Sequence, residues 1–211
     1  MKKLALAVAI VSLGAVALIT AAIAKNGNGG GSGFSARLSG YEEIIPASFN
    51  AGPPPTFVGE AGAVSTIGRG SFSARLRDDP LRIEYRLRYA DLEGTTTTQA
   101  HIHFGQKHTV GGVSAFLCGD TNTTNNIPNT CPPDSATLEG TIVASDVVGP
   151  AGQGIAPGEL VELIRAIRNG AAYVNVHTNM WPNGEIRGQI DNGRHFGGFF
   201  RGKGKGRGKD D

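Results

Sequence analysis

The chain has 211 residues, with 20 Lys and Arg, 18 Asp and Glu, and two Cys. Residues 1–24 hold two lysines and no acid, and residues 201–211 hold five basic and two acidic residues, so the body between them carries about −3. This charge argues against a nucleic-acid-binding body. The 187 residues after position 24 are enough for one domain with a sizeable hydrophobic core.

The N-terminus has the pattern of a secretory signal. Lys2 and Lys3 precede an uncharged apolar run over residues 4–20, and residues 22–24 form an Ala-x-Ala cleavage motif. We therefore predict a signal peptide over residues 1–24 and an extracytoplasmic protein, periplasmic or secreted, with no membrane span after cleavage. An uncleaved anchor is the alternative, because the run approaches the length that spans a bilayer.

Short segments that alternate apolar and polar residues predict β-strands along the chain. Residues 81–89 alternate apolar and charged side chains, which is typical of a strand with one face in the core. Gly and Pro residues separate the segments. This pattern predicts an all-β fold, an antiparallel Greek-key β-sandwich or barrel of about seven to nine strands. Further strand candidates are residues 34–38, 63–67, 72–76, 113–117, 137–144 and 185–190.

Two histidines lie two positions apart in a predicted strand over residues 99–104. Side chains alternate between faces along a strand, so His101 and His103 point to one side and the apolar residues around them to the other. The apolar side would pack into the core, which leaves both imidazoles on the outer face. Such a pair suits a transition metal, and a solvent-facing or hydrogen-bonded pair is the alternative.

Cys118 and Cys131 are the two cysteines of the chain. In an oxidising compartment we expect them to form a disulfide. The segment between them is short and has no hydrophobic pattern, so the bridge would close a loop and add roughly 3 kcal/mol of stability. Metal ligation by the two thiols is the disfavoured alternative, because no Cys-x-x-Cys motif or adjacent His accompanies them.

One amphipathic helix is predicted near residues 158–168. The apolar residues Leu160, Leu163, Ile164 and Ile167 follow helical spacing, and Asn-Gly at residues 169–170 supplies a stop. We expect this helix to cap the β-fold beside the next strand, and we assign no chemistry to it.

A third histidine lies in a predicted strand over residues 173–178. His177 shares its face with Tyr173 and Asn175, while two valines take the core-facing side. If this strand neighbours the strand over residues 99–104, the three imidazoles converge on a site suited to copper or zinc. Neutral imidazoles are required, so we expect metal binding to weaken as the pH falls through about 6.5.

The C-terminal residues 193–211 form a Gly/Lys/Arg-rich tail that cannot bury a core, and we expect it to be disordered. An anionic polymer or a cell-surface component is the expected partner of this tail. A merely solvated tail is the alternative.

Four stretches of the chain resemble the CHRD domain, the module named after chordin. They are residues 34–43, 100–105, 169–178 and 182–190, and the resemblance spans about residues 33–192, which we take as the domain. CHRD domains occur in secreted proteins of bacteria and animals. The resemblance therefore implies a secreted module, without a general biochemical role.

A second resemblance concerns the histidines. Residues 101–105 are similar to the copper-binding His-x-His strand of copper/zinc superoxide dismutases, and residues 176–177 resemble a strand that gives those enzymes a later ligand. The resemblance implies an anion-guiding role for Arg187, for which a salt bridge or cross-strand contact is the alternative. The chain lacks a candidate for the bridging histidine and the second metal cluster of those enzymes. The implied metal ligands are His101, His103 and His177.

Three functions are compatible with these features. The first is a secreted module that binds copper or zinc through three histidines on the outer face. The second is a metal-free extracellular binding or matrix module, and the third is a copper-storing protein without turnover. The ligands alone do not imply a reaction, so the sequence leaves open whether the protein is an enzyme.

Overall fold

The computed structural model describes residues 33–45, 48–50, 56–58, 61–119 and 127–191. The predicted signal peptide and the predicted C-terminal tail lie outside these residues. The helices are α1 (Leu160–Arg168) and the short 3-10 helices η1 (Gly40–Glu42), η2 (Ala144–Asp146) and η3 (Ala151–Gln153). The strands are β1 (Gly33–Ser39), β2 (Ile44–Ile45), β3 (Ser48–Asn50), β4 (Thr56–Val58), β5 (Ala61–Gly62), β6 (Arg69–Asp78), β7 (Leu81–Ala90), β8 (Thr97–Phe104), β9 (Gly112–Cys118), β10 (Ala136–Ile142), β11 (Ala172–Thr178) and β12 (Ile186–Gln189).

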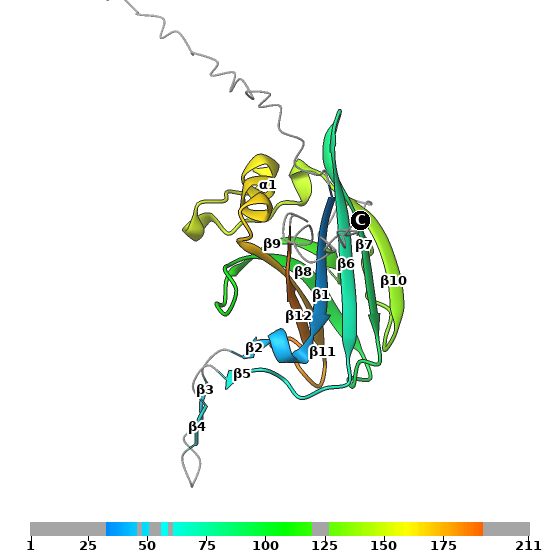
Figure 1. Ribbon diagram of the computed structural model, residues 1–211, viewed down its shortest axis with the longest axis vertical. Coiled ribbons are helices and arrows are strands. Elements are labelled where there is room, and N and C mark those ends of the chain that lie inside the picture. The colour runs from blue at the N-terminus through cyan, green and yellow to red at the C-terminus, as the bar shows by residue number, and fades with distance from the viewer. Residues whose placement is uncertain (1–32, 46–47, 51–55, 59–60, 120–126, 192–211) are drawn as a thin grey trace, which may run out of the picture.

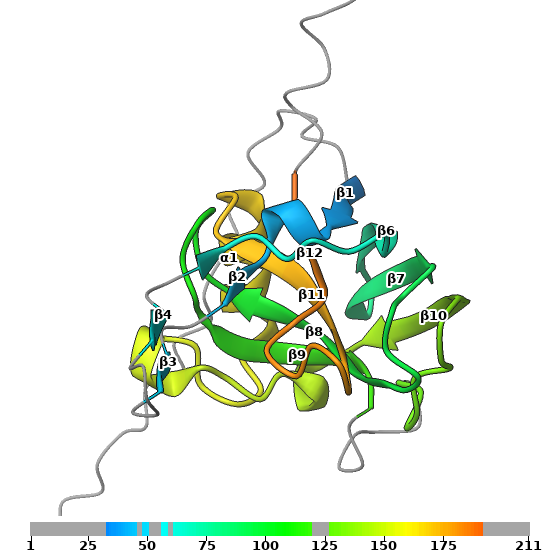
Figure 2. The same ribbon diagram turned by 90° about the horizontal axis from the view of Figure 1, so that it is seen from below.

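Eight of these strands form one antiparallel sheet in the order β10-β7-β6-β1-β12-β11-β8-β9 (Figure 1). The sheet curls until its two ends approach each other, and the Tyr85 hydroxyl on β7 donates a hydrogen bond to the Leu117 carbonyl on β9 at 2.6 Å. Figure 2 shows the strands wrapped around an interior. The predicted all-β fold is confirmed, in the form of a sheet nearly closed into a barrel.

The hydrophobic core follows from the alternation of side chains along the strands. On β7, Ile83 and Leu87 are fully buried, whereas Arg86 and Arg88 are exposed. The identical pentapeptides at residues 34–38 and 72–76 give β1 and β6 the same alternation, and the two strands pair directly. Because the inner face of each strand is apolar, closing the sheet removes all of these faces from water together.

The predicted helix is confirmed as α1. Leu163 and Ile167 of its apolar stripe are completely buried in the core, and the helix contacts β11, as expected. Gly170 follows the helix with a φ of 68°, a left-handed conformation that glycine adopts without strain. Among the described residues, no helix is long and apolar enough to cross a membrane.

The predicted strand over residues 63–67 is wrong. Ala63 has a φ of 84°, which breaks an extended strand, and its backbone N–H donates to the Glu43 carbonyl at 2.7 Å. The Val64 N–H donates to the Gly40 carbonyl instead of a sheet partner. This segment is a loop that buries Val64 against the core. Over so short a stretch, a loop with one buried side chain has the same apolar–polar pattern as a strand.

Candidate metal centre

The three predicted histidines lie on two strands that are neighbours in the sheet. Strands β8 and β11 pair antiparallel, with Asn175 opposite His101 and Tyr173 opposite His103. On the other face of these strands, Ile102 and two valines are fully buried in the core. The pairing therefore places all three imidazoles on the outer face of the sheet, as their sequence positions predicted.

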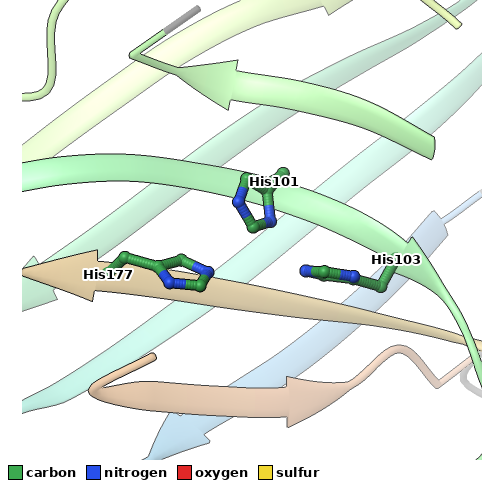
Figure 3. Close-up of side chains that lie close together, drawn as sticks. All are labelled: His101, His103 and His177. Atoms are coloured by element: carbon green, nitrogen blue, oxygen red, sulfur yellow. The ribbon is translucent and has the colours of Figure 1, made fainter. Parts of the chain in front are cut away.

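The three rings converge on a common point (Figure 3). The ring centre of His101 lies 4.5 Å from that of His103 and 4.5 Å from that of His177. Each residue offers one ligand nitrogen, and the three nitrogens lie within 4.8 Å of one another. The juxtaposition that a shared site requires is thus present, although the two strands lie about 70 residues apart in the chain.

One nitrogen of each ring is bound to an oxygen acceptor. His103 Nδ1 lies 2.8 Å from the Gly111 carbonyl oxygen, and His177 Nδ1 lies 2.9 Å from the Pro182 carbonyl oxygen. His101 Nε2 lies 3.1 Å from the side-chain oxygen of Gln99. Because these oxygens only accept hydrogen bonds, the facing nitrogen carries the proton in each neutral ring. The opposite nitrogen of each ring keeps a free lone pair.

These opposite nitrogens are His101 Nδ1, His103 Nε2 and His177 Nε2. All three are buried and have no hydrogen-bond partner among the described residues. Leaving a buried acceptor unsatisfied costs about 1–3 kcal/mol. A water molecule has two donors, so a single water could satisfy two of the three nitrogens. A divalent cation can accept all three lone pairs at once.

Burial keeps the three imidazoles neutral. It lowers the pKa of His101 well below the ordinary value, and the neighbouring His177 and His103 add to this effect. Desolvation likewise lowers the pKa of His103 to about 4, although its hydrogen bond to Gly111 acts in the opposite direction. The pKa of His177 is lowered for the same reason. The expected loss of metal binding near pH 6.5 therefore moves to lower pH.

A tyrosine and an arginine support the cluster from the side. The Tyr173 ring stacks on the His103 ring, and the Arg187 guanidinium carbon lies 3.5 Å from the centre of the Tyr173 ring. Since β11 lies between β8 and β12, Tyr173 separates Arg187 from His103. Arg187 is only 2% exposed and donates to the Gln106 carbonyl at 3.1 Å. The cross-strand contact expected as the alternative role of Arg187 is present, and its anion-guiding role stays an expectation.

The loop over residues 105–111 covers this side of the cluster. The Gly111 N–H donates to the Tyr173 hydroxyl at 3.1 Å, while the Gly111 carbonyl accepts from His103. A Cβ at Gly111 would overlap the carbonyl oxygen of Phe104, so no other residue fits there without moving the loop. The Gly111 carbonyl thus fixes the tautomer of His103, and the Gly111 N–H ties the same residue of the loop to Tyr173.

A buried carboxyl group lies beside the cluster. Glu43 is 3% exposed and accepts hydrogen bonds from the Asn175 amide and from the Ile44 N–H. Burial raises the pKa of Glu43 to about 7, and the charge of Arg187 opposes that shift. Asn175 pairs with His101 on β8 and with Arg187 on β12, so this polar group extends the outer face toward β12.

The predicted disulfide is present between Cys118 and Cys131, with sulfur atoms 1.94 Å apart. Cys118 ends β9 and pairs with Ala100, the residue before His101. The bridge therefore anchors the segment after β9 beside the histidine-bearing strand. A disulfide also indicates an oxidising compartment.

Several supporting residues were absent from the expected site. Tyr173 could have been identified from the sequence, because strand alternation places it on the same outer face as His177. Gly111 and Pro182 act through backbone carbonyls, which no sequence pattern marks. His108, the remaining histidine near the motif, is exposed in the loop and lies outside the cluster.

Comparison with known proteins identifies one family. The family model described as CHRD domain matches residues 34–190, which include the three histidines and both cysteines. Searches of curated proteins and of solved structures each found no match.

Proposed function

The chain belongs to the CHRD domain family of extracellular domains, and on this premise we propose that it binds one copper or zinc ion through His101, His103 and His177. The supporting observation is the set of three buried, unpaired nitrogens that face one another. Their partner oxygens hold each ring with its lone pair toward the common point. Metal-binding histidines are held in this way by second-shell acceptors.

The donor set favours a transition metal over a hard cation. Three neutral imidazoles offer nitrogen ligands, which suit zinc and copper, whereas calcium and magnesium prefer oxygen. Around a tetrahedral zinc ion with bonds of 2.0–2.1 Å, ligand nitrogens lie about 3.3 Å apart. The nitrogens of this cluster lie within 4.8 Å, so an approach of at most about 1.5 Å completes the geometry. Cu(II) should bind more tightly than zinc at such a site.

Three protein ligands leave a coordination position for another group. His177 is the least buried of the three residues. A three-histidine zinc or copper ion can take water or a small anion at such a position. This arrangement is compatible with storage, transport or catalysis, and the ligands alone favour none of these.

A metal-binding experiment tests the proposal on the mature full-length chain. Elemental analysis and titration with Cu(II) should give one ion per chain. Trp181 is the only tryptophan and precedes Pro182, whose carbonyl holds His177, so we expect copper to quench its fluorescence. The His101→Ala, His103→Ala double variant should bind no stoichiometric metal. The His177→Ala variant should lose roughly 100-fold or more in affinity, at or beyond the upper end of second-shell effects, because it removes a direct ligand.

The matched control is His108→Asn. His108 is exposed and has a φ of 63°, a conformation that asparagine tolerates. This variant removes an imidazole outside the cluster and should leave copper affinity unchanged. Unchanged affinity in His177→Ala, or no stoichiometric metal in the wild type, would instead favour the metal-free extracellular binding module.

A further inference from the structure

A second region of the sheet carries a concentration of positive charge. Strands β1, β6, β7 and β10 hold seven arginines and three acidic residues, a net charge of +4. The other described residues hold four basic and eleven acidic residues, a net charge of −7. The strand alternation that buries Phe72 and Leu87 turns every one of these arginines outward. We name the outward side of β1, β6 and β7 the arginine face.

The register aligns part of this face into a row across the strands. Arg37 on β1 lies opposite Ser71 on β6, and Ser71 lies opposite Arg88 on β7. Adjacent strands are about 4.8 Å apart, so the two arginines span roughly 10 Å with a hydroxyl between them. Arg75 stands on the same side of β6, farther along the strand.

Three of the seven arginines have no protein partner among the described residues. Arg37, Arg75 and Arg88 make no ion pair or side-chain hydrogen bond there, and Arg37 and Arg88 belong to the row. The other four arginines are engaged with acids: Arg69 with Asp91, Arg77 and Arg82 with Glu84, and Arg86 with Glu139. The unpaired guanidinium groups are therefore available to an anionic ligand.

A groove runs along the same surface. Its lining includes Ser35 and Ser73 and the charged residues Arg75, Arg86, Glu84 and Glu139. Both carboxylates are already paired with arginines. Ser35, Ser73 and Arg86 lie opposite one another on three successive strands. The groove thus combines hydroxyl groups, which pair with other hydroxyls, and guanidinium groups, which bind carboxylates through two parallel hydrogen bonds.

We infer that the arginine face binds an acidic polysaccharide, a polymer of uronate sugars that lies across β1, β6 and β7. Its carboxylates would pair with Arg37, Arg75 and Arg88, and its hydroxyls would bond to the serines between them. The outward residues of these strands include no aromatic side chain, whereas single-stranded nucleic acids are bound by stacking on aromatic rings.

The experiment measures binding of the mature full-length chain to polygalacturonate by isothermal titration calorimetry at low ionic strength. Dextran serves as the uncharged polymer and single-stranded DNA as the competing polyanion. We expect binding to polygalacturonate, none to dextran and weaker binding to DNA. The triple variant Arg37→Gln, Arg75→Gln, Arg88→Gln should bind polygalacturonate roughly tenfold more weakly, since each exposed ion pair contributes modestly.

The matched control removes three positive charges elsewhere, as Lys107→Gln, Arg165→Gln, Arg168→Gln. It should bind polygalacturonate like the wild type, and thermal unfolding should show that both triple variants remain folded. Wild-type affinity in the arginine-face variant would overturn the inference, because binding would then come from another basic segment such as residues 201–211. Equal loss in the two triple variants, or DNA binding as tight as polygalacturonate binding, would overturn it as well.

Discussion

The rings of His103 and Tyr173 lie face to face, with their centres 4.6 Å apart and their planes within 5°. The two residues are cross-strand partners on β8 and β11. The backbone of Gly111 connects them, because its carbonyl accepts from His103 and its N–H donates to Tyr173. The orientation of His103, a proposed ligand, therefore depends on Tyr173, which is not itself a proposed ligand.

The Tyr173→Phe variant tests this dependence. It keeps the stacked ring and removes the hydroxyl that accepts from the Gly111 N–H, so the loop that holds His103 should loosen. Loss of such a second-shell contact lowers metal affinity by about 10–100-fold, and we expect the lower end of that range. Copper titration monitored by Trp181 fluorescence gives the affinity. Tyr85→Phe is the control, because it removes a hydroxyl hydrogen bond to Leu117 on the core side of the sheet and should leave copper affinity unchanged.

The pH dependence of copper binding should follow the buried pKa values. Protons compete with the metal only when the folded imidazoles can be charged, and burial lowers the pKa of His103 to about 4. The fall in copper affinity should therefore lie below pH 6.5 and continue as the pH approaches 4. Titrations across this range in non-chelating buffers provide the check. A loss centred near pH 6.5 would mean that the rings are solvated like free histidine.

The stability of the metal-free protein should fall as the solution is acidified. An unfolded histidine binds its proton near pH 6.5, whereas folded His103 resists protonation until about pH 4. Between these values the unfolded state holds more protons, so the free energy of unfolding decreases as the pH drops, by up to about 3 kcal/mol for this residue. Below about pH 4 the contribution levels off.

Urea denaturation of the wild type and the His103→Gln variant at several pH values isolates this effect. The variant should lose less stability between pH 6.5 and 4. Glu43, whose pKa is raised to about 7, contributes with the opposite sign in both proteins and largely cancels in the comparison. Parallel curves for the two proteins would contradict the low pKa of His103.

Gly111→Ala should weaken both stability and copper binding. The added Cβ overlaps the backbone carbonyl of Phe104, so the loop must shift and its hydrogen bonds to His103 and Tyr173 are strained. We expect a loss of about 1–3 kcal/mol in the free energy of unfolding, typical of overpacked sites. Gly152→Ala is the control, because no atom lies within 4 Å of its Cβ position and the change should be nearly neutral.

Removal of the disulfide should lower the free energy of unfolding while the hydrophobic core stays folded. Cys118 and Cys131 are 13 positions apart, and the chain-entropy estimate for such a loop is about 3 kcal/mol. The Cys118→Ala, Cys131→Ala variant should lose about that amount. Hydrogen exchange should accelerate most in β9 and in residues 127–131, which the bridge joins to it. The amides of β6 and β7 should stay protected. Uniform loss of protection would show that the bridge supports the whole sheet.

Local pattern was sufficient for most of the fold. The alternation of residues 81–89 predicted β7, because apolar residues take one face of the strand and charged residues the other. The apolar stripe from Leu160 to Ile167 predicted α1. The sequence of residues 63–67 has the apolar–polar alternation of a strand. The sequence does not reveal that Ala63 is left-handed or that Val64 is buried from a loop. Conformation at Ala63 is set by contacts with residues 40–43, which are distant in sequence.

The three histidines that converge in the candidate site were predictable from the sequence, and their surroundings were not. Strand parity placed His101 and His103 on one face and His177 on the outer face of its own strand, and the resemblance to the copper site pointed to the same three residues. The pairing of β8 with β11 is non-local, so spacing alone could not establish it. Burial of the outer face also escaped prediction, because it depends on loops that cover the cluster, and this burial moves the expected pH dependence from 6.5 toward 4.

Both histidine-bearing strands lie inside the sheet, where each is hydrogen-bonded to a neighbour on either side. Backbone pairing thus assembles the three rings independently of any ion, unlike in zinc fingers, whose folding requires the metal. A chelator should strip a bound ion and leave the circular dichroism spectrum unchanged. If the proposed ion binds, the domain would release and reload it over repeated cycles, with the exchange rate governed by the covering loops and not by refolding.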